Sequence, residues 1–178
     1  MRKVVAYELL SLDGVAEEPL EFITDFDDVM EENLRRVIAD QDAVLLGRRT
    51  YDDWAAYWPG AQEEPFSPFI NSVAKFVVTS SPCNQTWANT TVVAGELSEF
   101  VTDLKQQSGA NIGVHGSIAL TQALLDRGLI DELRLVIAPA IHAHGRKLFE
   151  QAAAQRLALT RAVTSPLGYV LLDFEVRG

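Results

Sequence analysis

Three segments of the chain combine glycine, arginine and hydroxyl residues in a way that suits phosphate binding. The positions concerned are Gly47, Arg48 and Thr50 in "LGRRTY", Thr79, Ser80 and Ser81 in "VTSS", and Gly116, Ser117, Ile118 and Ala119 in "VHGSIA". Glycine lets the backbone approach a phosphate closely, and the free N–H groups of a helix N-terminus favour an anion. Arginine and hydroxyl groups can hold a further phosphate through charge-assisted hydrogen bonds. Two glycine turns and a separate arginine–hydroxyl site match the layout of NADPH, which has a pyrophosphate and a 2′-phosphate.

Each of these segments also has a purely structural interpretation. A glycine between a strand and a helix can be only a tight turn, and the three hydroxyls can cap a turn. Arg48 and Arg49 could pair with Asp52 and Asp53 rather than with a ligand. The chain has no G-x-G-x-x-G sequence, which disfavours an ordinary Rossmann site. From these residues alone we predict a nucleotide-binding α/β domain.

The elements that must position these segments alternate along the chain. Apolar runs predict strands at 4–10, 43–47, 75–81, 90–95, 111–117, 132–139, 156–163 and 168–176. Amphipathic spacing predicts helices at 27–41, 50–58, 96–109 and 117–128, with a short helix near 69–74. Thr50 and Ser117 are the expected N-caps. The alternation predicts one α/β domain over 1–178, with a mostly parallel sheet, helices on both faces and a C-terminal antiparallel hairpin at the edge.

Two polar residues stand out within these elements. Glu8 interrupts an apolar strand, so it is expected to be a hydrogen-bonded structural residue or to lie at a sheet edge. His115 precedes the turn at Gly116, where it could support the turn, carry charge against a phosphate or simply be packed.

Composition narrows the classes of partner. The net charge of the 178 residues is −10, which argues against nucleic acid or an anionic membrane as the main partner. No apolar run reaches the length of about 18 residues that a membrane span needs. Cys83 is the single cysteine, so no internal disulfide can form, and the pattern fits a reducing cytosol. A cytoplasmic location is therefore expected.

The motifs, taken in order, resemble the dihydrofolate reductase-like superfamily. The resemblance is greatest to the branch that includes the reductase domain of the riboflavin-biosynthesis deaminase-reductase. The segments that carry it are "SLDGV", "LLGRRTY", "FVVTSS", "VHGSIALTQALLDRGLIDELRLVIAP" and "GRKLF". Together they cover nearly the whole chain. The resemblance implies a three-layer fold with a mostly parallel central sheet flanked by helices, and binding of NADPH.

The resemblance also implies a role for each segment. Gly47, Arg48 and Thr50 would contact the cofactor phosphates, and Thr79, Ser80 and Ser81 would flank the 2′-phosphate. The turn and helix start at 116–119 would hold the pyrophosphate. Asp13 and Gly14 would lie beside the nicotinamide, which makes Asp13 a candidate acid or substrate-orienting group. The alternative is that Asp13 and Gly14 form only a turn.

The chain departs from the family pattern at two places. Dihydrofolate reductases carry a pocket carboxylate on the first helix after a Trp-containing loop, whereas 16–26 here reads "AEEPLEFITDF" without tryptophan. This argues against dihydrofolate as the substrate. The segment "IHAHG" places His142 and His144 where an apolar and a small residue are expected. An H-x-H pair could ligate a metal, but the family needs none, so we expect histidines of an exposed loop or a subunit contact, and no metal site.

The leading hypothesis is an NADPH-dependent reductase. Its substrate would be a small pterin-like, pyrimidine-like or other carbonyl or imine compound, similar to the substrates of dihydrofolate reductase and of 5-amino-6-(5-phosphoribosylamino)uracil reductase. The riboflavin step itself is disfavoured because no second basic cluster clearly serves a substrate phosphate. The alternative is a non-catalytic NADP(H)-binding sensor or interaction protein on the same fold. A homodimer through the sheet edge or the hairpin is also possible.

Overall fold

Strand β1 (Val4–Leu10) lies near the middle of the sheet. Six of its seven residues are buried, as expected for a strand that is covered on both faces. It pairs in parallel with β5 (Asn111–His115) on one side and with β6 (Glu132–Ile137) on the other. Glu8 therefore does not lie at a sheet edge, and that alternative is wrong.

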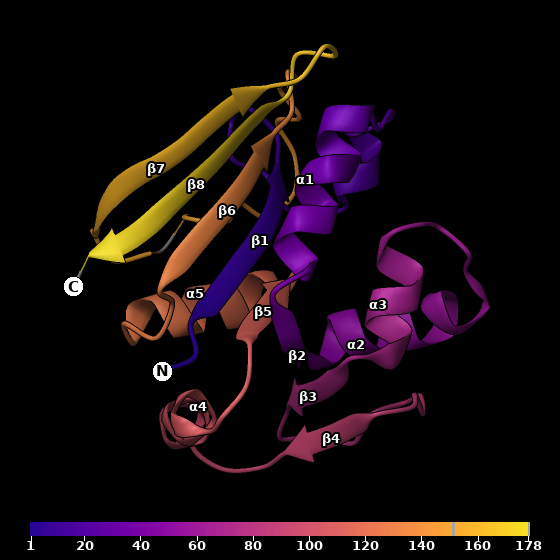
Figure 1. Ribbon diagram of the computed structural model, residues 1–178, viewed down its shortest axis with the longest axis vertical. Coiled ribbons are helices and arrows are strands. Elements are labelled where there is room, and N and C mark those ends of the chain that lie inside the picture. Colours follow the sequence, from indigo (N-terminus) through magenta and orange to yellow (C-terminus); the bar gives the residue numbers. More distant parts are fainter. Residues whose placement is uncertain (151, 178) are drawn as a thin grey trace.

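The computed structural model describes residues 1–150 and 152–177, which form one eight-stranded sheet (Figure 1). The strand order is β4-β3-β2-β5-β1-β6-β8-β7. The remaining strands are β2 (Gln41–Gly47), β3 (Ala74–Val78), β4 (Thr90–Val93), β7 (Arg156–Thr164) and β8 (Val170–Arg177). Strands β1 to β6 pair in parallel, whereas β8 pairs antiparallel with both β6 and β7. The expected mostly parallel sheet and C-terminal hairpin are thus confirmed.

Helices cover both faces of the sheet, so the architecture has three layers (Figure 1). One apolar core lies beneath α1, α2 and α3, and a second core lies beneath α4 and α5. The bounds are α1 (Asp28–Ile38), α2 (Arg48–Tyr57), α3 (Phe66–Ser72), α4 (Leu97–Gln106) and α5 (Ile118–Asp126), with short 3₁₀ helices η1 (Pro19–Glu21) and η2 (Trp58–Gly60). The α1 helix begins after Asp27, whose carboxylate accepts a hydrogen bond from the Met30 N–H.

The start of α2 differs from the expectation. The helix begins at Arg48, directly after the last residue of β2, so Thr50 is not its N-cap and that prediction is wrong. Gly47 occupies the N-cap position in an extended conformation, and no side chain caps the helix. The strand therefore passes into the helix without a connecting loop. This brings the first turn of α2 to the carboxyl edge of the sheet.

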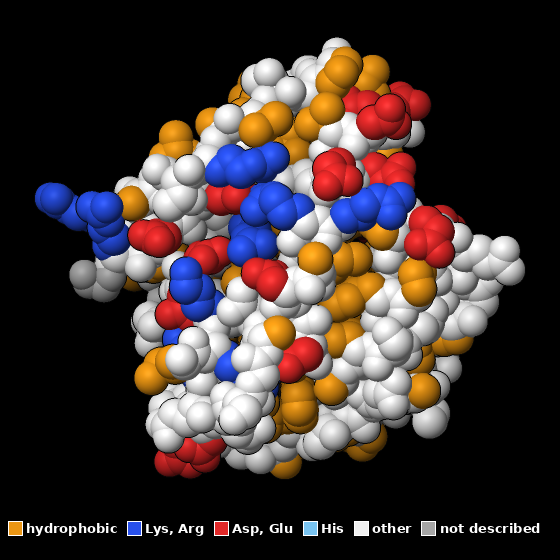
Figure 2. Space-filling view, viewed as in Figure 1, with side chains coloured by type: hydrophobic (Ala, Val, Ile, Leu, Met, Phe, Trp, Pro, Cys, Tyr) orange, Lys and Arg blue, Asp and Glu red, His pale blue; other side chains and the backbone are white. Residues whose placement is uncertain are grey.

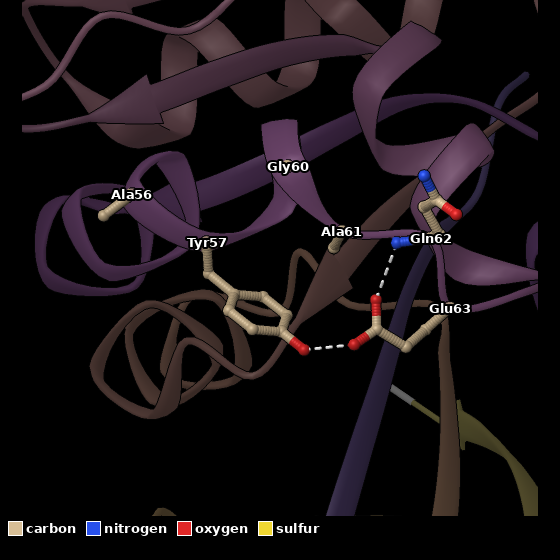
Figure 3. A pocket seen from close by; sticks show the side chains of 6 residues that line it. All are labelled: Ala56, Tyr57, Gly60, Ala61, Gln62 and Glu63. Carbon is tan, nitrogen blue, oxygen red and sulfur yellow. Dashed lines mark hydrogen bonds between the residues drawn. The ribbon is translucent and has the colours of Figure 1, made fainter.

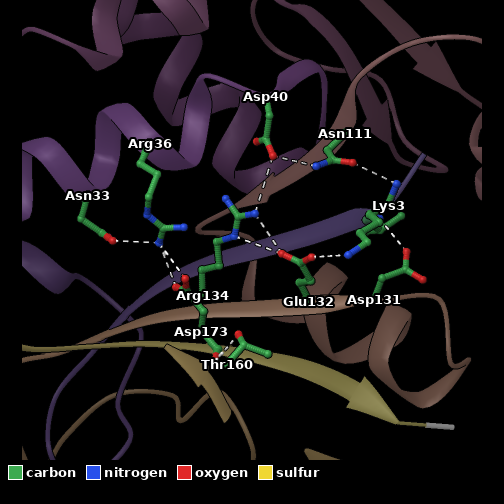
Figure 4. Close-up of polar contacts among 11 residues, drawn as sticks. Lys3, Asn33, Arg36, Asp40, Asn111, Asp131, Glu132, Arg134, Thr160 and Asp173 are labelled. Atoms are coloured by element: carbon green, nitrogen blue, oxygen red, sulfur yellow. Dashed lines mark hydrogen bonds and ion pairs between the residues drawn. The ribbon is translucent and has the colours of Figure 1, made fainter. Parts of the chain in front are cut away.

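The open part of the sheet on the α1 side carries a network of paired charges (Figures 2 and 4). Arg36 contacts the Asp173 carboxylate at 2.8 Å, and Arg134 contacts Glu132 at 2.9 Å. Lys3 also reaches Glu132, at 2.7 Å. These basic side chains have acidic partners within the chain, so the network is a structural feature that links α1 and the start of β1 to β6 and β8.

Candidate functional site

Two strand–helix junctions meet at the carboxyl edge of the sheet. The Gly47 N–H, between β2 and α2, donates to Ser117 Oγ between β5 and α5 at 3.0 Å. Thr50 Oγ1 donates to the Gly116 carbonyl at 3.4 Å. A Cβ atom on Gly47 would lie 3.6 Å from Ser117 Oγ, so the two junctions are in close contact. Four of the predicted site residues are therefore brought together.

The β5–α5 junction has the properties of an anion site. Gly116 is exposed and has φ +62°, a left-handed conformation that glycine adopts without strain. The N–H groups of Ile118 and Ala119, in the first turn of α5, have no partner within the helix. Ser117 occupies the N-cap position, but its hydroxyl does not cap α5 because it accepts the Gly47 N–H instead. Ser117 is thus the N-cap residue, as predicted, but its side chain joins the two junctions instead of capping the helix.

Arg48 lies beside the hydroxyl turn that follows β3. In the pairing of β2 with β3, Gly47 is opposite Val78, so Arg48 and Thr79 follow adjacent strand ends. Thr79 Oγ1 accepts the Ser81 N–H at 3.0 Å and donates to the Ser81 carbonyl at 2.8 Å. The predicted turn cap is therefore present. Arg48 remains 42 % exposed, so it is accessible to a ligand.

Arg48 and Arg49, which the sequence could pair with Asp52 and Asp53, have different partners in the structure. Arg48 Nη1 contacts Asp52 Oδ2 at 3.1 Å, which confirms the first pair. Arg49 lies 3.8 Å from Glu17 instead of pairing with Asp53. Glu17 also binds Arg146 of the "GRKLF" segment at 2.7 Å, so Arg49 faces the loop that follows β1.

Asp13 is held by three hydrogen-bond donors. Ser11 Oγ donates to its carboxylate at 2.7 Å, and the N–H groups of His142 and Ala143 donate at 3.0 and 3.1 Å. These bonds, led by that from Ser11, lower the pKa of Asp13 far below its usual value. The carboxylate is thus ionised and fixes the loop after β6. This environment supports a positioning role and gives no support to proton donation. Gly14, with φ +87°, completes the turn.

Two buried titratable residues lie close to the junctions. His115 is bonded to Gln41 at 2.8 Å and packs against Tyr7 and Phe66. Burial lowers the pKa of His115 to about 3, so it is a neutral packed residue. The alternative that His115 carries charge against a phosphate is therefore wrong. Glu8 accepts a hydrogen bond from Thr121 Oγ1 at 2.7 Å, which confirms a hydrogen-bonded structural residue. Burial raises the pKa of Glu8 to about 7.

Sequence reasoning missed the aromatic side of the junction. Trp54, on α2, is partly exposed, and its Cζ2 atom lies 3.5 Å from the Cβ position of Gly116. It packs edge-on against Trp58 and Phe66. In the sequence, the only indication that Trp54 lies here was its spacing of one helical turn from Thr50.

A shallow depression lies at the other end of α2, where Tyr57 donates to Glu63 (Figure 3).

The histidines of the "IHAHG" loop are placed against other side chains. His142 Nε2 is 3.1 Å from Glu21, and its ring packs at a tilt against Phe22 and lies 6.2 Å from the ring of His144. Within residues 1–150 and 152–177, no group of three or more His, Cys, Asp or Glu side chains is placed to hold a metal ion. Over the same residues, no helix has both the length and the apolarity to cross a bilayer.

The eight-stranded sheet and its flanking helices form a dihydrofolate reductase-like fold. Residues 2–171 match the model of the RibD C-terminal domain family, so the chain belongs to that family. Two curated relatives are the uncharacterized proteins YyaP and YwjB of Bacillus subtilis. YyaP is 27% identical to this chain over 144 residues, which cover 77% of this chain and 75% of YyaP. YwjB is 27% identical over 153 residues, which cover 84% of each chain.

Solved structures agree with this fold. A putative riboflavin biosynthesis protein from Shewanella sp. PV-4 has a TM-score of 0.80 at 17% identity, with 99% of both chains covered. The deaminase/5-amino-6-(5-phosphoribosylamino)uracil reductase of Thermotoga maritima has a TM-score of 0.69 at 12% identity, with 99% of this chain and 57% of that chain covered. Dihydrofolate reductase of Enterococcus faecalis, complexed with NADP(H) and RAB-propyl, has a TM-score of 0.64 at 12% identity, with 99% of this chain and 97% of that chain covered. The family and these neighbours support a reductase-like protein.

Proposed function

We propose that the chain, as a single domain over 1–178, is an NADPH-dependent reductase. The observation that carries this proposal is the contact between the two strand–helix junctions, made by Gly47 with Ser117 and by Thr50 with Gly116. Two free helix N-termini then face one region, and Arg48 lies next to it. This arrangement suits a dinucleotide with an additional phosphate. The structurally similar dihydrofolate reductase in complex with NADP(H) supports the same choice of cofactor.

The residues present fit the phosphates of NADPH. Gly116 has no side chain to obstruct a ligand, and the N–H groups of Ser117, Ile118 and Ala119 would hold the pyrophosphate together with Gly47 and Thr50. Arg48, Thr79, Ser80 and Ser81 would hold the 2′-phosphate. The nicotinamide would lie toward Asp13 and Gly14, and when bound it would supply the hydride.

The substrate in this proposal is a small pterin-like, pyrimidine-like or other carbonyl or imine compound. The partly exposed indole of Trp54 beside Gly116 offers a surface on which a planar ring can stack. Asp13 keeps the loop after β6 in place rather than delivering a proton. The proton that completes the reduction then comes from water or from another group beside the substrate.

A non-catalytic NADP(H)-binding protein is the second candidate function. It is favoured by the engagement of Asp13, the acid nearest the proposed nicotinamide position, in three hydrogen bonds. Cofactor binding without turnover would be its signature.

The proposed partner, besides a small molecule, is a second copy of the chain. Strand β7 is the last strand of the sheet, and its Leu157 and Leu159 are 41% and 56% exposed. An apolar edge strand is a natural site for pairing with another chain. A reductase of this kind would act in the cytoplasm.

Calorimetric titration with NADPH, and with NADH as the control, tests the proposal. We expect micromolar NADPH binding and much weaker NADH binding, because only NADPH carries the 2′-phosphate. Binding of neither would overturn the proposal. Turnover on a panel of pterin-like, pyrimidine-like and other carbonyl substrates then separates the reductase from the non-catalytic alternative.

A further inference from the structure

One carboxylate joins the first turn of α2 to the loop that follows β3. Asp52 accepts hydrogen bonds from Arg48 Nη1 at 3.1 Å, from the Asn84 N–H at 2.8 Å and from Asn84 Nδ2 at 3.1 Å. Its side chain is only 12% exposed, although the loop around it is open. Asp52 is thus in direct contact with both Arg48 and the segment that carries the hydroxyl turn.

The same loop is attached to α2 by a second residue. Tyr51 Oη donates to the Gln85 carbonyl at 3.3 Å, and its ring lies 6.2 Å from that of the buried Trp87. Trp87 is itself held by Asn71 at 2.9 Å. The far part of the loop is therefore anchored independently of Asp52. The contact of Asp52 with Asn84 acts on the near part, only a few residues beyond Ser81.

A carboxylate at this position has an electrostatic cost for an anionic ligand. Asp52 brings a negative charge next to Arg48, where it repels a phosphate. A bound phosphate that contacts both Arg48 and the hydroxyls needs these groups at a fixed separation, however. Holding them in place before binding lowers the entropy lost on association. The geometry of Asp52, with donors from both groups, points to this positioning effect.

We propose that Asp52 is a positioning residue that determines the preference for NADPH over NADH. It does so by holding Arg48 and the 79–84 segment at the separation that a 2′-phosphate requires. The inference rests on the proposed function, because it assumes that this face of the site binds the 2′-phosphate. NADH has an uncharged 2′-hydroxyl in place of the phosphate, so its affinity should not depend on Asp52.

The test compares Asp52→Ala with Asp53→Ala, which removes the same charge from the next, exposed position of α2. We expect Asp52→Ala to weaken NADPH binding about tenfold, the loss of roughly one charged hydrogen bond, and to leave NADH binding unchanged. Asp53→Ala should leave both affinities unchanged. Asn84→Ala keeps the Arg48–Asp52 pair and removes one loop contact, so a smaller loss confined to NADPH is expected.

The outcomes separate this inference from the proposed function. A wild-type protein without NADPH preference overturns both. If the wild type prefers NADPH and Asp52→Ala keeps or increases that preference, only the role of Asp52 is overturned. An increase would mean that the Asp52 carboxylate mainly competes with the phosphate for Arg48. If Asp52→Ala does not fold, the NADPH-to-NADH ratio of Asn84→Ala decides: an unchanged ratio overturns the inference. A merely structural role would lower the unfolding temperature without changing that ratio.

Discussion

The Gly47 N–H and Ser117 Oγ are 3.0 Å apart, although 70 positions separate them in the sequence. This bond joins the N-termini of α2 and α5, the two helices that face the proposed pyrophosphate position. It also explains why Ser117 is buried at the start of a helix whose next turn is partly open.

Replacing Ser117 with alanine should separate the two junctions slightly. The Gly47 N–H would lose its partner, at a cost of about 1 kcal/mol, so both stability and NADPH affinity should fall, the latter by about fivefold. Urea unfolding and calorimetry measure the two effects. Ser108→Ala, at an exposed position, is the control. Unchanged NADPH affinity in Ser117→Ala would show that the junction contact is irrelevant to the ligand.

Replacing Arg48 with alanine should weaken NADPH binding by about 1.5–3 kcal/mol, the scale of a charge-assisted hydrogen bond. The cost in stability should be small, because the Arg48 side chain is 42% exposed and Asp52 keeps its two hydrogen bonds from Asn84. Arg49→Ala provides the control, since Arg49 faces Glu17 instead. An Arg48→Ala protein that binds NADPH as tightly as the wild type would remove Arg48 from the site.

Replacing Gly116 with valine should abolish NADPH binding while the protein still folds. The position is exposed, and a Cβ there would meet only the Trp54 ring, at 3.5 Å, but φ +62° adds local strain. Gly128→Val, at φ +64° and with nothing within 4 Å of a Cβ, is the matched control. Circular dichroism reports folding and calorimetry reports binding. Retained binding would mean that the turn is only structural.

Glu8 should make stability depend on pH. Its pKa is about 7 in the folded protein against an ordinary 4.5, so between these values the folded state keeps a proton that the unfolded state releases. Stability should therefore fall as pH rises through this interval, with each unit of pKa difference corresponding to about 1.4 kcal/mol. Glu8→Gln should lack this fall. Urea unfolding at about pH 5 and about pH 8 measures it.

His115 changes stability with pH in the opposite direction. Its contribution is the same in wild type and in Glu8→Gln, so it cancels when the two proteins are compared. Its pKa is about 3 in the folded protein against an ordinary 6.5, so the unfolded state takes up the proton first on acidification. Stability from this residue is lost as pH falls below about 6.5. Parallel pH profiles for wild type and Glu8→Gln would show that Glu8 does not titrate in this range.

Leu159→Lys should convert a dimer into a monomer if β7 forms the contact between copies. The side chain is 56% exposed and lies opposite Phe174 in the hairpin. Val92→Lys, on the opposite edge strand β4, is the control, with Val92 54% exposed. Sedimentation velocity measures the mass. A monomeric wild type would reject the dimer, and dissociation by Val92→Lys alone would assign the contact to β4.

The sequence was sufficient for the local structure. The apolar run at 4–10 coincides with β1, and the helix predicted at 27–41 corresponds to α1 at 28–38, because the spacing of apolar residues along a short segment reports which side is buried. The glycines at 47 and 116 indicated where strands pass into helices. Helix starts were less certain, as the wrong N-cap at Thr50 illustrates, since any nearby hydroxyl residue resembles a cap.

Contacts between distant segments depended on the tertiary structure. Arg48 and Asp52 could be paired from their i,i+4 spacing, but the contact of Asp52 with Asn84 could not, because it joins a helix to a loop of another strand. The same holds for the acceptor role of Ser117 and for the buried partner of Glu8, Thr121. The sequence by itself determined which residues could bind phosphate and which elements carry them. Only the parallel order of the strands, which brings their carboxyl ends to one edge, decided which of these residues meet.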